Sequence, residues 1–102
     1  MAIYAQSSES GNTLTIRVEG KFDFASHTDF RDAYRSQTEA GTNYQIDLSK
    51  TEYMDSSALG MLLMIKEHAE VNKGTVTLHH PPPEIKDIFE MANFYELFTI
   101  KG

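Results

Sequence analysis

The sequence predicts an α/β domain with a mixed sheet of four or five strands and about three helices. Short stretches with strand-like patterns are separated by stretches with helical spacing. They follow the order β-β-α-β-α-β-α-β, which favours parallel pairing, while the opening hairpin adds antiparallel pairing. The length of 102 residues suits one domain, and we expect it to span residues 1–102.

The strands are predicted from short apolar or alternating stretches, at residues 3–6, 13–18, 44–48, 75–79 and 95–100. In the second stretch, Leu14, Ile16 and Val18 alternate with polar residues, which is typical of a half-buried strand. Gly20 is expected to end that strand. Residues 51–55 are expected to form only a connection.

The helices are predicted from apolar residues three and four positions apart. They run from the N-cap Ser26 to Ala40, from Asp55 or Ser56 to about Asn72, and from Pro82 or Pro83 onwards. Gly41 and Gly74 are expected to stop the first two helices. Candidate core residues outside the strands are Phe22, Phe24, Phe30, Met61 and Met64.

Composition excludes several classes of function. Nine Lys and Arg against fifteen Asp and Glu give a net charge of −6, which disfavours nucleic acid and anionic lipid as partners. The absence of cysteine excludes disulfides, thiolate metal sites and a cysteine nucleophile. The N-terminus lacks a signal-peptide pattern, and the apolar run at residues 61–65 is far below the ~20 residues of a membrane span. We therefore expect a cytoplasmic protein without nucleic-acid or membrane partners.

The most informative stretch is Asp55-Ser56-Ser57, at the predicted start of a helix. Backbone N–H groups there lack intrahelical acceptors, and the helix dipole is positive. A phosphate on a serine at this position would add a charge of roughly −1.5 to −2 close to those donors. Asp-Ser-Ser before an apolar helix is also a common capping sequence, so the residues alone leave both interpretations open.

Catalysis and metal binding have less support in the sequence. A serine nucleophile needs a base, and the candidates are His27, His68, His79 and His80. There is no Gly-x-Ser-x-Gly motif, and His68 would lie about 18 Å from Ser56 along one helix. Neighbouring strand residues point to opposite faces, so His79 and His80 are not expected to share a metal ion. We predict no catalytic residue, no metal and no cofactor.

Three parts of the chain carry a family resemblance: residues 18–23, residues 46–49 with 53–60, and residues 88–94 with 97–100. They resemble the end of the second strand, the Asp-Ser-Ser signature and the last helix and strand of STAS domains. The closest subgroup is the bacterial anti-anti-sigma factors, also called anti-sigma factor antagonists. Two features depart from the pattern: Ala58 stands where glycine is common, and the final helix often found in the family is missing after Gly102.

The resemblance implies a non-enzymatic protein that binds an anti-sigma factor, often a serine kinase with a histidine-kinase-like fold. It implies that the kinase phosphorylates Ser56, that the partner is then released, and that a metal-dependent serine phosphatase reverses the modification. By motif position, Asp23, Asp55 and Ser57 flank the phosphorylation site and face the partner. STAS-like domains also act as non-switching scaffolds or as subunits of signalling or transport assemblies, and that alternative stays open.

Overall fold

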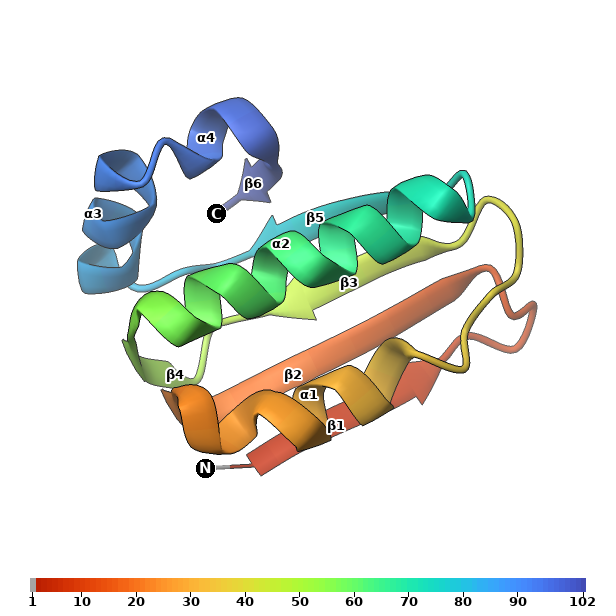
Figure 1. The fold of residues 1–102 in the computed structure, drawn as a ribbon, viewed down its shortest axis with the longest axis horizontal. Coiled ribbons are helices and arrows are strands. Elements are labelled where there is room, and N and C mark those ends of the chain that lie inside the picture. The colour runs from red at the N-terminus through yellow and green to blue at the C-terminus, as the bar shows by residue number, and fades with distance from the viewer. Residues whose placement is uncertain (1) are drawn as a thin grey trace.

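Two helices, α1 (His27–Tyr34) and α2 (Ser56–Val71), lie side by side on one face of a six-stranded sheet (Figure 1). The structure is a computed structural model that describes residues 2–102. The strands are β1 (Ala2–Ser7), β2 (Thr13–Phe22), β3 (Asn43–Asp47), β4 (Thr51–Met54), β5 (Thr75–His79) and β6 (Thr99–Lys101). A 3-10 helix, η1 (Phe24–Ser26), precedes α1, and α3 (Pro83–Met91) and α4 (Phe94–Leu97) lie between β5 and β6. The predicted α/β class and element order are confirmed, with one strand and one helix more than predicted.

The main sheet has the strand order β1-β2-β3-β5-β6. β1 and β2 form the predicted antiparallel hairpin, and all other pairs are parallel. β4 is not part of this order. It pairs with the end of β2, where Phe22 lies beside Met54. Parallel strands from two strand–helix–strand units thus place α1 and α2 on the same face.

The prediction that residues 51–55 form only a connection is wrong. β2 is ten residues long and extends beyond β3, so its last residues have a free edge that β4 occupies. Thr51 is buried there, and its Oγ1 donates a 2.8 Å hydrogen bond to the carbonyl oxygen of Val18. Gly20 does not end β2, because the strand continues through a positive φ of 83° with a shift in register.

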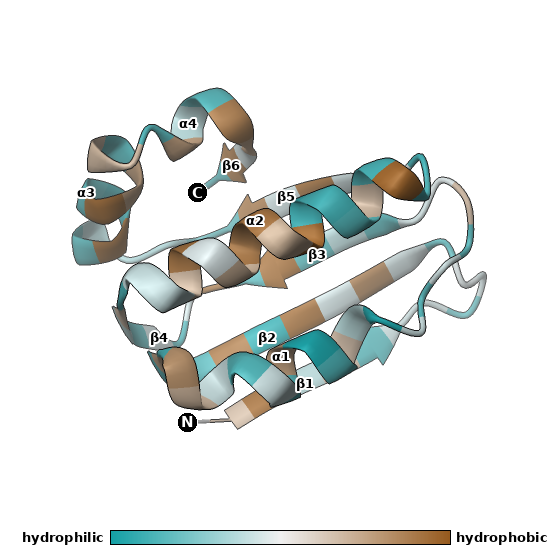
Figure 2. Ribbon diagram, viewed as in Figure 1, coloured by the Kyte–Doolittle hydropathy of each residue, from teal (hydrophilic) through white to brown (hydrophobic). Residues whose placement is uncertain are grey.

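The core lies between the sheet and the two helices. On β2 the predicted residues Leu14, Ile16 and Val18 all face inward, and on α2 Leu62 and Ile65 are fully buried. Figure 2 shows the apolar residues alternating along β2 and forming bands on α2. Complete burial of one such side chain contributes about 1.5–3 kcal/mol, so this layer dominates the stability of the fold.

Helix α1 ends at Tyr34, and the prediction that it runs to Ala40 is wrong. The chain turns at Gln37, whose backbone N–H donates to the carbonyl oxygen of Tyr34 at 2.9 Å. The Gln37 side chain then donates to Thr42 Oγ1 at 3.2 Å. These bonds hold residues 36–42 as a connection, so Gly41 does not cap a helix.

Helix α2 ends close to the predicted position, but its cap differs from the prediction. The left-handed residue after the helix is Lys73, with φ 57°, and not Gly74. The N–H of Gly74 donates to the Ala69 carbonyl oxygen at 2.7 Å, and the N–H of Lys73 donates to that of Glu70 at 3.1 Å. This pair of bonds is the Schellman arrangement, which satisfies the last carbonyls of a helix.

Three further predictions are wrong. Residues 95–97 belong to helix α4, so the last strand is only Thr99–Lys101. Phe24 is 72% exposed and Met64 is 45% exposed, although both were predicted to be core residues. The other three candidate core residues, Phe22, Phe30 and Met61, are buried as predicted.

Candidate functional site

Two strand ends bring the predicted site residues to one corner of the molecule. Asp23 follows β2 and Asp55 follows β4, and these strands are paired neighbours. The N–H of Asp55 donates to the carbonyl oxygen of Phe22 at 3.4 Å, which ties the two ends together. The ends of β2 and β4 and the start of α2 therefore lie next to one another (Figure 1), and this brings Asp23 and Asp55 together.

Asp55 is the N-cap of α2. Its Oδ1 accepts a hydrogen bond from the N–H of Ala58 at 3.0 Å, and its carbonyl oxygen accepts one from Leu59 at 3.3 Å. Ser56 is the first residue of the helix and is exposed, while Ser57 is half-buried. Within residues 2–102, the N–H groups of Ser56 and Ser57 have no hydrogen-bond acceptor. The corner thus presents a reachable hydroxyl beside two free donors at the positive end of a helix dipole.

Asp23 fixes the neighbouring loop in a similar way. Its Oδ1 accepts a hydrogen bond from the N–H of Ala25 at 3.1 Å, and its own N–H donates to Ser26 Oγ at 3.3 Å. This capping box shapes η1, which contacts α2. Both carboxylates are half-buried and used as caps, so their positions beside Ser56 are fixed by backbone hydrogen bonds.

Exposed apolar side chains lie next to this corner and further along α2. Phe24 follows Asp23 directly, Tyr53 lies on β4, and Leu63 and Met64 lie further along α2. Exposed apolar patches of this kind mark protein interaction surfaces. Their exposure was not predicted, although a helical projection of residues 56–71 places Ser56, Leu63 and Met64 on nearby positions of one face.

The histidines are placed apart from Ser56 or are already engaged. The Nε2 atom of His68 is 2.7 Å from the carbonyl oxygen of Gln37, and the His27 ring stacks on Phe24. His79 is half-buried, and burial with the charges of His80 and Lys101 lowers its pKa. Across the described part of the chain, no three His, Asp or Glu residues are arranged to hold a metal ion.

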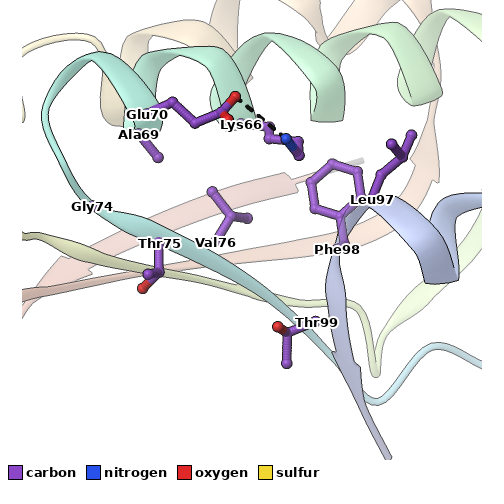
Figure 3. A pocket seen from close by; sticks show the side chains of 9 residues that line it. All are labelled: Lys66, Ala69, Glu70, Gly74, Thr75, Val76, Leu97, Phe98 and Thr99. Atoms are coloured by element: carbon purple, nitrogen blue, oxygen red, sulfur yellow. Dashed lines mark ion pairs between the residues drawn. The ribbon is translucent and has the colours of Figure 1, made fainter.

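A small hollow of about 200 Å³ lies on another face of α2 (Figure 3). Val76 and Phe98 line it on the sheet side, and Lys66 pairs with Glu70 across its rim at 3.3 Å. The opposite charges of Lys66 and Glu70 balance at the rim, so this hollow has no net charge to attract a charged ligand. In the region that the structure describes, no helix has the length and apolar character needed to cross a membrane.

Comparison with known proteins shows the family. The model described as "Mlab, STAS domain" matches residues 5–99. A STAS-domain containing protein of Pseudomonas aeruginosa is 44% identical over 100 residues, which cover 98% of this chain and 99% of the relative. The chain therefore belongs to the STAS domain family, as the Asp-Ser-Ser signature predicted.

Solved structures share the fold at low sequence identity. An anti-sigma factor antagonist from Mycobacterium paratuberculosis matches 98% of this chain and 84% of its own, with a TM-score of 0.82 and 16% identity. Unphosphorylated SpoIIAA, described as an anti-sigma factor antagonist, matches 97% of this chain and 86% of its own, with a TM-score of 0.73 and 19% identity. SpoIIAA in its phosphorylated form, from Bacillus, matches with a TM-score of 0.68, covering 97% of this chain and 90% of its own at 19% identity.

Proposed function

We propose that the protein is an anti-sigma factor antagonist whose binding to its partner is controlled by phosphorylation of Ser56. The observation that carries the proposal is the exposed position of Ser56 as the first residue of α2, among exposed apolar side chains. A kinase can reach such a hydroxyl without unfolding the domain. The likeness to SpoIIAA, which was solved in unphosphorylated and phosphorylated forms, supports the proposal through the shared fold.

The proposed partner is an anti-sigma factor with a histidine-kinase-like serine kinase fold, and a metal-dependent serine phosphatase restores the unmodified state. This assignment rests on the family resemblance of the Asp-Ser-Ser motif. Asp23, Asp55 and Ser57 flank the modified serine and contribute to the partner surface. The switch operates in the cytoplasm, and the acidic chain does not use nucleic acid or a membrane as its partner.

Electrostatics explains how phosphate would release the partner. A phosphate on Ser56 adds a charge of about −1.5 to −2 beside the carboxylates of Asp55 and Asp23. An interface formed around a neutral hydroxyl then meets like-charge repulsion and must remove water from a charged group. A loss of ~3 kcal/mol weakens binding more than a hundredfold, which is sufficient to exchange partners.

The same geometry favours binding over catalysis at Ser56. The Oδ1 atoms of Asp23 and Asp55 accept backbone N–H groups, a role that shapes the loops and does not activate a hydroxyl. His68, on the same helix, is engaged with Gln37. We therefore propose no enzymatic activity for this corner.

Binding titrations with variants test the switch. Ser56→Ala is expected to bind the anti-sigma partner like the parent protein, and Ser56→Asp is expected to bind it at least tenfold more weakly. Ser10→Ala and Ser10→Asp are the matched controls, because Ser10 is exposed in the β1–β2 turn, at the end of β2 away from Asp23. Both are expected to stay within a few-fold of the parent. Phosphopeptide mass spectrometry on protein from the native host should find phosphate on Ser56.

Two outcomes would contradict the proposal. Phosphate found only on Ser57 would show that the acceptor is wrongly assigned. Equal affinities of Ser56→Ala and Ser56→Asp would indicate a non-switching scaffold.

A further inference from the structure

A groove of about 340 Å³ runs between α1 and α2. Its α1 wall carries Arg31, Tyr34 and Arg35, and its α2 wall carries Met64, Glu67 and Val71. Of these residues, the proposed switch mechanism uses only Met64, as one of the exposed apolar side chains near Ser56. The switch at Ser56 therefore does not account for the groove as a whole.

The α2 wall of the groove exposes apolar surface. Met64 is 45% exposed and Val71 is 76% exposed, although both lie on the central helix of the domain. Below them the groove has a rigid base, because the Tyr34 ring is buried and packs edge-on against His68 with a centroid separation of 5.0 Å. A firm base with an apolar wall is suited to holding the apolar face of another helix.

The α1 wall is basic, in contrast to the net charge of −6 for the whole chain. Arg31 and Arg35 are one helical turn apart, and both are exposed. Arg35 pairs with Asp32 at 3.3 Å, but both side chains are exposed, so this pair is weak and easily exchanged. The pKa of the Tyr34 hydroxyl is raised by burial and lowered in part by the Arg31 charge, which agrees with a guanidinium group at the groove. The negative charges beside the two arginines come from Asp32 on α1 and from Glu67 on the opposite wall.

The groove lies on the same helix as Ser56, about two turns further along α2. Ser56, Gly60 and Met64 follow one another at intervals of four residues, and all three are exposed. Eight residues of helix span about 12 Å, so Met64 lies about two turns from Ser56 along the same face. A segment that occupies the groove would therefore extend towards the serine.

We propose that the α1–α2 groove binds an amphipathic helix of the partner protein, with its apolar stripe on Met64 and Val71 and an acidic flank facing Arg31 and Arg35. This inference rests on the proposed function, because it names the chemistry of the partner at the same surface. It also supplies a reason for release. A phosphate on Ser56 would place new negative charge close to one end of an acidic segment, and the two would repel each other.

Designed peptides test the groove directly. One 18-residue amphipathic helix carries a leucine stripe with glutamates on one flank, and its counterpart carries lysines there. The parent protein is expected to bind the glutamate peptide at least tenfold more tightly than the lysine peptide. The double variant Arg31→Glu/Arg35→Glu is expected to reverse this preference.

The matched control applies the same change of charge elsewhere. Lys86→Glu/Lys101→Glu alters two exposed lysines on α3 and β6, and it is expected to change either affinity less than threefold. Methyl NMR signals of Met64 and Val71 should shift when the glutamate peptide is added to the parent protein. Unchanged methyl signals at 1 mM peptide, or equal effects of the two double variants, would overturn the groove assignment.

The failure of this inference can be distinguished from failure of the switch. If Ser56→Asp still loses the anti-sigma partner while the groove variants keep it, only the groove assignment is wrong. If the groove variants lose the partner while Ser56→Asp keeps it, the phosphorylation switch is wrong.

Discussion

Among the single residues of the chain, Gly74 is required by space and not by its φ angle. A side chain at this position would overlap the backbone carbonyl oxygen of Thr42. That oxygen also accepts a 3.0 Å hydrogen bond from the N–H of Thr75, so it cannot move freely. Glycine is common after a helix because it can adopt a left-handed conformation or because a side chain would not fit. In this turn Lys73 occupies the left-handed position and Gly74 the crowded one.

Replacing Gly74 with alanine should therefore destabilise the fold, by about 2–3 kcal/mol, because the two loops must move apart. Gly60→Ala is the control, since Gly60 is exposed in α2 and an added methyl group there meets nothing within 4 Å. Alanine is the better helix former, and this variant should be up to ~1 kcal/mol more stable than the parent. Urea unfolding measures both, and a similar change in the two variants would contradict the steric argument.

The Asp-Ser-Ser corner could be located from the sequence because its N-cap depends on neighbouring residues only. N-capping is a local property, and an Asp before an apolar helical run fixes the first turn within a few residues. Asp55 indeed caps α2, and Ser56 opens it. The exposure of Phe24 could not be predicted in this way, because it depends on how η1 lies against α2.

At the scale of elements, α2 has one face in the core and one at the surface. Met61 is buried, whereas Met64, less than one turn later, is exposed. The sequence could not separate the two because the first half of the helix is apolar on most sides. β4 was missed for a related reason, since its position depends on pairing with the end of a distant strand.

The two methionines provide a matched pair of variants. Met61→Ala should cost about 2–4 kcal/mol of unfolding free energy, because it leaves a cavity in the core. Met64→Ala should change the unfolding free energy by less than ~1 kcal/mol, because this residue is already 45% exposed in the folded chain. Urea denaturation of both variants tests this, and a large loss of stability in Met64→Ala would show that this side chain packs in the core.

At the scale of the whole molecule, one row of side chains crosses five strands. Strand register aligns Tyr4, Arg17, Asp47, His79 and Lys101. Along the strands these residues alternate with those that face α1 and α2, so the row lies on the opposite face of the sheet. The sequence predicted β1, β2, β3 and β5, and only part of β6. Which residues lie side by side across the strands could not be predicted, because it depends on the strand register.

One member of this row, His79, predicts how the free energy of unfolding depends on pH. The pKa of His79 is lowered below 6.5 by burial and by the charges of His80 and Lys101, against the opposing effect of Asp47. At a pH between the His79 pKa of the folded chain and that of the unfolded chain, the unfolded chain binds more protons than the folded one. The free energy of unfolding therefore decreases as the pH falls below about 6.5. His79→Gln should flatten this decrease in urea unfolding series between pH 7 and pH 5. An unchanged slope in the variant would show that His79 does not cause it.

The branching of the sheet bears on how Ser56 can be reached. β2 borders β3 from Thr13 to Arg17, but only its last residues border β4. Phe22, Thr51 and Met54 are buried where these two strands pair, so the branch is anchored in the core. An enzyme that modifies Ser56 would therefore act on the domain in its native shape, with no local unfolding step before the reaction.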